Sequence, residues 1–105
     1  PLAVGNGQTP VRAFVFSKDG ATWVVYWHGS GEGWLRLPIA AGEASLYEDF
    51  AGKAVAFERG GASITVPATK RLYLKTTLAR DAVERAFAAA ALLPPGKAPT
   101  SAAAR

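Results

Sequence analysis

The stretch that decides the fold is Val11–His28, which reads VRAFVFSKDGATWVVYWH. Its two halves, Val11–Ser17 and Thr22–His28, are rich in the β-branched and aromatic residues that favour strands. Between them, Asp19-Gly20 is a residue pair typical of a two-residue hairpin turn. The sequence therefore predicts an antiparallel β-hairpin at this point.

The following residues repeat this pattern at short intervals. Turn signals such as Gly60-Gly61 separate further segments in which apolar and polar residues alternate. With the hairpin, seven strands are expected, at Val11–Ser17, Thr22–His28, Trp34–Ile39, Ala44–Phe50, Lys53–Arg59, Ala62–Ala68 and Arg71–Thr76. Short strands joined by short turns indicate an antiparallel sandwich or barrel rather than alternating βαβ units.

Residues 78–93 change to a helical period. Apolar side chains recur there on one stripe, at Ala79, Val83, Ala86, Phe87 and Ala90. Thr76 or Thr77 is the expected N-cap, and Pro94-Pro95-Gly96 is expected to end the helix. The sequence thus predicts one C-terminal amphipathic helix after the strands.

The length of 105 residues supports one domain. We expect a linker or irregular lead-in at residues 1–10, the domain at 11–93, and a flexible tail rich in Pro and Ala at 94–105. The chain has no methionine and begins with Pro1, so we expect it to be a piece of a longer polypeptide.

The net charge of +4 does not indicate nucleic-acid binding. Residues 11–93 carry ten Lys and Arg against eight Asp and Glu, a difference of +2, and these charges alternate along the chain. No apolar run approaches the roughly 18 residues that cross a bilayer, so no membrane partner is expected. Without cysteine, the compartment cannot be read from redox chemistry.

The segment Tyr26–Trp34, YWHGSGEGW, contains the only histidine and is the first candidate for chemistry. A dinucleotide-binding loop would need glycine where Trp34 stands, and a Walker loop would need Gly-Lys-Ser/Thr. A serine-nucleophile elbow would need glycines at His28 and Glu32. We therefore expect no catalytic residue here, and interpret the glycines as providing backbone angles in a five-residue hairpin connection.

Two other kinds of site are also disfavoured. One histidine and no cysteine cannot form a transition-metal site, and no motif indicates a cofactor, so neither is expected. Glu48 and Asp49 are adjacent, and neighbours on a strand point to opposite faces. We interpret these two acids as a solvated strand end that accepts hydrogen bonds from the following turn.

The strand Thr22–His28 is apolar on both faces. Trp23 and Trp27 share one face, and Tyr26 and His28 share the other. Such a strand is usually central, with a second sheet on one side and something else on the other. The C-terminal helix or another domain is the expected cover for that second side.

Several of these segments together resemble a known domain type. They are the AFVF and WVVYW strands with their Asp-Gly turn, WLRLP at 34–38, LYEDFAGK at 46–53 and LYL at 72–74. The arrangement resembles the C-terminal antiparallel β-sandwich domain that follows the catalytic barrel in many multidomain glycoside hydrolases. The chain departs from that pattern where Lys70–Leu74 and a helix stand in place of a final Pro-Val/Ile-Tyr strand.

The resemblance implies a non-catalytic accessory domain that packs against the catalytic domain of a longer parent chain, a glycoside hydrolase. The alternative is a carbohydrate-binding module, with Tyr26, His28, Glu32 and Trp34 as an aromatic sugar platform. A structural or adaptor domain unrelated to sugars is the third possibility. Under the first reading the same four residues would face the partner domain.

Overall fold

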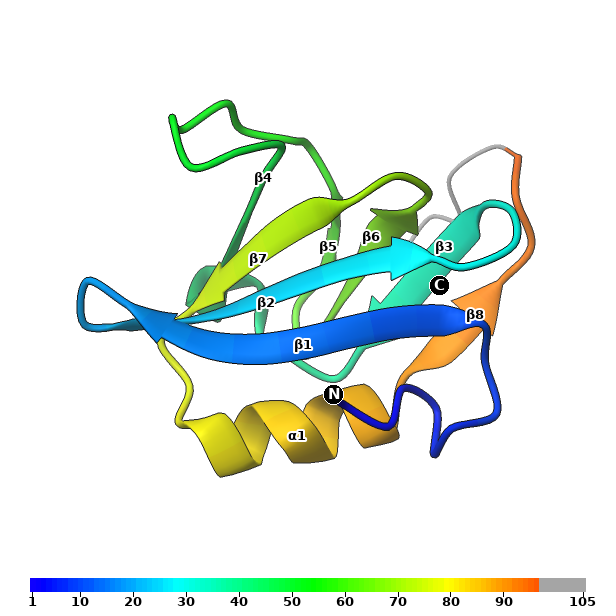
Figure 1. Ribbon diagram of the computed structural model, residues 1–105, viewed down its shortest axis with the longest axis horizontal. Coiled ribbons are helices and arrows are strands. Elements are labelled where there is room, and N and C mark those ends of the chain that lie inside the picture. Colours follow the sequence, from blue (N-terminus) through cyan, green and yellow to red (C-terminus); the bar gives the residue numbers. More distant parts are fainter. Residues whose placement is uncertain (97–105) are drawn as a thin grey trace.

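The protein is a two-layer antiparallel β-sandwich with one α-helix, as a computed structural model that describes residues 1–96 shows (Figure 1). Sheet A has the order β1 (Val11–Lys18), β2 (Ala21–His28), β7 (Leu72–Thr76), β4 (Ala44–Tyr47). Sheet B has the order β5 (Glu58–Gly60), β6 (Ser63–Ala68), β3 (Gly33–Leu37), β8 (Ala91–Leu93). Helix α1 covers Arg80–Ala88, and a 3-10 turn, η1, covers Ala41–Glu43. The predicted sandwich with a C-terminal helix is confirmed.

The first hairpin forms as its sequence predicts. Phe16 lies opposite Trp23 in the β1–β2 ladder, and the turn is Asp19-Gly20. Asp19 has a φ of 53° and Gly20 a φ of 78°. Two successive positive φ values define the turn type that matches the twist of paired strands, and Asp-Gly tolerates them well. This local chemistry fixes the register of the β1–β2 pair.

The predicted hairpin between the second and third strands is wrong. Residues 29–32 instead carry the chain from β2 in sheet A to β3 in sheet B. Gly29, Gly31 and Gly33 adopt no left-handed φ values. A Cβ on Gly29 would lie 2.7 Å from the Pro10 carbonyl oxygen, and one on Gly33 would lie 2.5 Å from that of Leu93. Close backbone approach, rather than an unusual turn, therefore requires glycine at these two positions.

The core lies between the two sheets and is mostly aliphatic. Val24 and Leu74 of sheet A are fully buried against it, as are Leu35 and Val66 of sheet B. Tyr26 is also fully buried, and its hydroxyl donates a hydrogen bond to the Pro67 carbonyl oxygen at 2.7 Å. Burial raises the pKa of Tyr26 well above its ordinary value, because the low-dielectric core disfavours the phenolate. Tyr26 therefore joins the two sheets as a neutral donor.

The predicted helix at residues 78–93 is shorter in the structure. It ends at Ala88, and Ala91–Leu93 forms β8, which pairs with residues 34–36 of β3. The open edge of β3 offers unpaired backbone groups, and pairing with them outweighs the helical preference of this apolar segment. The N-cap is Ala79 without a side-chain cap, so the prediction of Thr76 or Thr77 is also wrong.

Helix α1 closes the sandwich along the β1 edge (Figure 1). The Arg80 guanidinium donates to the Val15 carbonyl oxygen at 2.9 Å, and the Gly5 amide donates to that of Phe87 at 2.8 Å. Residues 1–10 form no helix or strand, but Val4 among them is buried in the core. The helix and the N-terminal segment thus fill one side of the core and leave the outer face of sheet A open.

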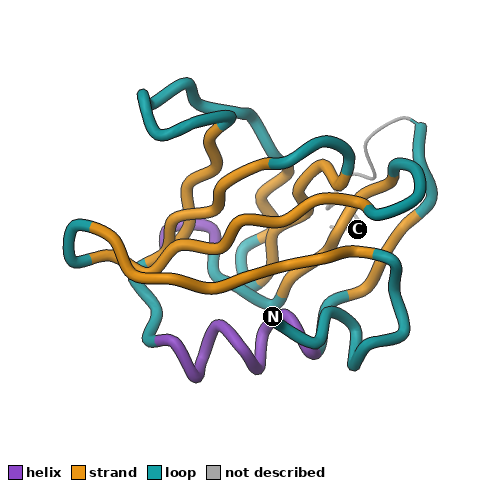
Figure 2. Tube along the Cα trace, in the orientation of Figure 1, coloured by secondary structure: helices purple, strands orange, loops and turns teal. Residues whose placement is uncertain are grey.

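The connection between β4 and β5 is longer than predicted. Between Tyr47 and Glu58 only Ala54 makes a ladder contact, an isolated bridge to Tyr47. Figure 2 shows this connection projecting from the sandwich as a loop. The next hairpin forms, but its turn lies one residue later than Gly60-Gly61 predicts, at residues 61–62, because Gly60 pairs with Ser63. From residue 97 on, the predicted tail lies outside the described residues.

Candidate interaction surface

The four residues expected at the end of β2 do not form one platform. Tyr26 lies in the core, so its ring is not available to a ligand. His28 is half-buried, and its Nδ1 accepts a hydrogen bond from the Ser30 amide at 3.1 Å. Glu32 is exposed in the sheet-to-sheet connection. Trp34 lies on the other sheet, where its Nε1 donates to the Gly96 carbonyl oxygen at 3.2 Å.

The acidic pair after β4 supports a turn. Asp49 Oδ1 accepts hydrogen bonds from the backbone amides of Ala51, at 2.9 Å, and Lys53, at 3.4 Å. Glu48 is paired with Lys70 at 3.1 Å and Lys53 at 3.8 Å. The prediction that Asp49 accepts turn hydrogen bonds is therefore confirmed.

A different surface gathers most of the aromatic residues, the outer face of sheet A. The β1–β2–β7–β4 register places Phe14, Val25, Tyr73 and Tyr47 in one cross-strand row. The next row along the strands consists of Phe16, Trp23, Lys75 and Ser45. We call the aromatic members of this surface the aromatic face: Phe14, Phe16, Trp23, Trp27, Tyr47, Phe50 and Tyr73. Rings from four strands and one loop thus share one side of the sheet.

The rings of the aromatic face contact one another closely. Phe14 stacks on Trp27 with centroids 5.9 Å apart, and Phe16 stacks on Trp23 at 6.4 Å. Phe50, from the loop after β4, lies 4.5 Å from Tyr73, 5.3 Å from Trp23 and 6.0 Å from Phe16. Offset and edge-to-face pairs of this kind stabilise the layer beyond the area they bury.

This layer is only partly closed to solvent. Trp23, at its centre, is 8% exposed, whereas Phe14 is 42% and Phe50 is 50% exposed. Within residues 1–96, these two phenylalanines are the large hydrophobic side chains classed as exposed, and both belong to the aromatic face. Exposed apolar side chains that gather on one face mark an interaction surface more often than scattered ones do.

Three cations lie above the rings. The Lys18 ammonium is 5.2 Å from the Phe50 centroid, Lys75 is 5.7 Å from Trp23, and the Arg71 guanidinium is 5.7 Å from Trp27. Lys18 is also paired with Asp19 at 2.9 Å. Among the described residues, no carboxylate lies within 4 Å of Lys75 or Arg71. The aromatic face is therefore apolar at its centre and positively charged above its tryptophans.

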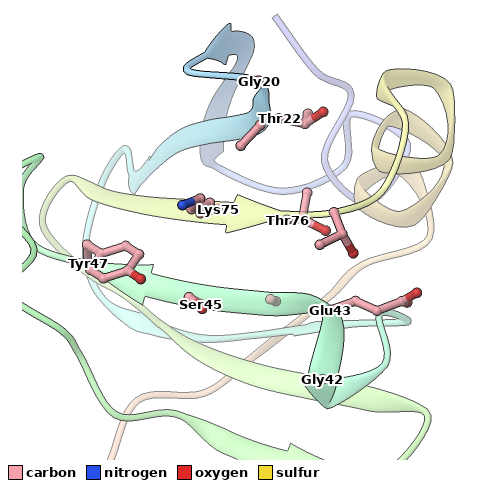
Figure 3. Close-up of a pocket in the computed structure, with 11 residues that line it drawn as sticks. Gly20, Thr22, Gly42, Glu43, Ser45, Tyr47, Lys75 and Thr76 are labelled. Atoms are coloured by element: carbon pink, nitrogen blue, oxygen red, sulfur yellow. The ribbon is translucent and has the colours of Figure 1, made fainter.

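Two of the hollows beside the aromatic face share Tyr47 and Lys75. The larger, of about 340 Å³, lies between the β1–β2 turn, the start of β4 and the end of β7 (Figure 3). The smaller, of about 250 Å³, lies beside Phe50 and Trp23. Both are open depressions on the surface rather than enclosed cavities.

Four of the seven residues of the aromatic face can be grouped from the sequence alone. Alternation along β1 and β2 shows that Phe14, Phe16, Trp23 and Trp27 share faces. It missed Tyr47, Tyr73 and Phe50 because β7 pairs between β2 and β4, a non-local arrangement that no turn signal specifies. The alternating Arg71–Lys75 segment carries a weak signal, since Tyr73 stands between two cations.

The remaining observations do not assign a family. No helix in the described part of the chain is long and apolar enough to cross a bilayer. Residues 1–96 contain no group of three or more His, Cys, Asp or Glu placed to hold a metal ion. No family model matches this chain, and neither a search of curated proteins nor one of solved structures finds a match.

Proposed function

We propose that this chain is a non-catalytic accessory β-sandwich domain that docks through its aromatic face on the catalytic domain of a longer carbohydrate-active enzyme. The observation that carries the proposal is the partly exposed aromatic layer on sheet A, with Phe14 and Phe50 open to solvent. Aromatic residues and arginine are enriched at the centres of protein interfaces. The glycoside hydrolase as parent rests on the resemblance alone.

The position of helix α1 supports docking at this face. The sequence offered two covers for the second side of β2, the helix or another domain. The helix packs at the β1 edge, with Val83 and Phe87 in the core. The aromatic face is thus the side of sheet A for which the described chain provides only the Phe50 loop as cover. Under this proposal, a neighbouring domain covers the rest of the aromatic face.

The proposal is tested by measuring binding between two separately produced polypeptides. One is this chain, and the other is the domain encoded directly upstream of Pro1 in the parent gene. We expect saturable binding in calorimetry. The Phe14→Ser, Phe50→Ser double variant should weaken it by at least about tenfold, because aromatic anchors dominate interface energies.

The matched control is Trp34→Ala, which removes an aromatic side chain from the opposite sheet and should leave the affinity unchanged. If the upstream region encodes no catalytic domain, or if the double variant binds like the wild type, the proposal is wrong. A parallel titration with soluble polysaccharides, followed by tryptophan fluorescence, tests the carbohydrate-binding alternative. That alternative requires a saturable change that Trp34→Ala abolishes.

A further inference from the structure

The larger hollow beside sheet A has a lining unlike that of the aromatic face. Figure 3 shows its side chains arranged around the β1–β2 turn, the start of β4 and the end of β7. Its polar side chains are the hydroxyls of Thr22, Ser45, Tyr47, Thr76 and Thr77, the Lys75 ammonium and the Glu43 carboxylate. A volume of about 340 Å³ lies within the range of small-molecule pockets. The hollow therefore has both the size and the polarity for a small hydroxylated ligand.

Three hydrogen-bond donors gather at one side of this hollow. Ser45 and Lys75 are direct cross-strand partners in the β4–β7 ladder, so their side chains leave the same face of the sheet, with Cβ atoms about 5 Å apart. Tyr47 lies two residues further along the same face of β4. Its ring is held by Trp23, with centroids 5.8 Å apart. The positions of these donors are thus set by strand pairing and ring packing.

These donors have no protein acceptor. In residues 1–96, the Ser45 and Tyr47 hydroxyls take part in no hydrogen bond, and Lys75 forms no ion pair. The Lys75 ammonium contacts the face of Trp23 instead. One ammonium flanked by two hydroxyl donors suits an anion with a single charge, such as a carboxylate. Phosphate is usually bound by arginines or by several backbone amides, which this group does not provide.

The far side of the hollow has the opposite polarity. Glu43 is the last residue of η1, directly before β4, whereas Tyr47 is the last residue of β4, so the two lie at opposite ends of the hollow (Figure 3). A carboxylate only accepts hydrogen bonds, so Glu43 suits ligand hydroxyl groups. A ligand that satisfies both ends carries a carboxylate at one end and hydroxyl groups at the other, and is long enough to extend across the hollow.

We propose that this hollow binds an acidic sugar, a short glycan segment that contains a uronic acid. Lys75 pairs with the sugar carboxylate, Ser45 and Tyr47 donate to its oxygens, and Glu43 accepts from hydroxyl groups of the same or the next sugar ring. The sugar site shares Tyr47 with the aromatic face, but this inference rests on the polar groups of the hollow, whereas the docking proposal rests on the exposed phenylalanines.

The test uses the whole 105-residue chain and amide chemical shifts from NMR. The probes are an acidic disaccharide of one galacturonic acid and one galactose, the neutral galactose disaccharide with the same linkage, and acetate. We expect saturable shifts of the hollow's amides with the acidic disaccharide. Binding of the neutral disaccharide should be weaker by at least about tenfold, since a charge-assisted contact contributes that much. Acetate should also bind more weakly, because it lacks the sugar hydroxyl groups. Lys75→Gln should remove the preference for the acidic disaccharide.

Two variants keep the result interpretable. Tyr47→Phe retains the ring against Trp23 and removes only the hydroxyl, so affinity should fall while the fold persists. Lys53→Gln removes an exposed ammonium outside the hollow and should leave affinity unchanged. The inference is overturned if the acidic disaccharide produces no saturable shifts, if acetate or the neutral sugar binds equally well, or if Lys53→Gln weakens binding as much as Lys75→Gln. None of these results bears on the calorimetric test of docking.

Discussion

The outer faces of the two sheets differ although both belong to one sandwich. The outer face of sheet B is mixed, and its cross-strand rows place Arg36 beside Thr65 and Trp34 beside Pro67. The outer face of sheet A is a layer of seven aromatic rings with cations above three of them. Antiparallel sheets commonly have one packed face and one solvated face. Sheet B follows that rule, and the departure in sheet A is the reason for proposing an interaction surface there.

The largest expected effect tests whether the aromatic face is a packed layer. Trp23→Ala should lower the free energy of unfolding by about 3–5 kcal/mol, because Trp23 is almost fully buried among Phe16, Tyr47 and Phe50. Trp34→Ala, on sheet B, should cost less than half as much, since that ring is only half-buried. Urea denaturation measures both. Equal losses would remove the distinction between the two faces.

A smaller effect tests how sheet B is completed at its edge. Gly33→Ala should destabilise by about 1–3 kcal/mol, because the new Cβ would lie 2.5 Å from the Leu93 carbonyl oxygen and force β8 to shift. Gly31→Ala is the matched control, since its Cβ would be at an ordinary 3.6 Å from the His28 ring. Thermal unfolding of the two variants compares them, and a Gly33→Ala protein as stable as Gly31→Ala would contradict the β3–β8 contact.

The smallest effect concerns the inner faces, which Tyr26 joins. Tyr26→Phe should cost about 1 kcal/mol, the usual contribution of one hydrogen bond, because it leaves the Pro67 carbonyl oxygen without its donor. The folded-state pKa of Tyr26 is raised above the unfolded value of about 10. Its neutral form thus contributes stability that is complete below about pH 10 and is lost as pH rises through the folded-state pKa.

Stability measured from pH 8 to 12 checks this sign. The wild type should lose stability above about pH 10, and Tyr26→Phe should show a shallower decline. Tyr73→Phe, which removes a tyrosine outside the core, is the control and should keep the wild-type decline. An identical alkaline decline in Tyr26→Phe and the wild type would show that Tyr26 is not the buried phenol.

The sequence predicted those parts of the fold that local chemistry specifies. Asp19-Gly20 determines the first hairpin, and the period change at residue 78 locates the helix. It could not predict β8, whose three residues are held only by pairing with β3, distant in the sequence. Nor could it decide which side of β2 faces the core, because Trp23 and Tyr26 make both sides apolar.

The same dependence on contacts between distant residues explains why the sequence did not predict the aromatic face. Tyr26, His28, Glu32 and Trp34 are close in sequence, and the chain divides them between the core, a connection and two sheets. The aromatic face is assembled instead from residues as far apart as Phe14 and Tyr73. The aromatic face can be identified only from the strand order of sheet A. That order depends on the total apolar surface that the two sheets bury together.

The central claim, that the aromatic face is an interface, is tested most directly by hydroxyl-radical footprinting. The oxidation rate of each aromatic side chain is compared between this isolated chain and the longer parent polypeptide. Our account predicts that Phe14 and Phe50, exposed in the isolated domain, are oxidised several-fold more slowly in the parent, while Trp34 is unchanged. Equal rates for the two phenylalanines in both proteins, or protection of Trp34 alone, would contradict it.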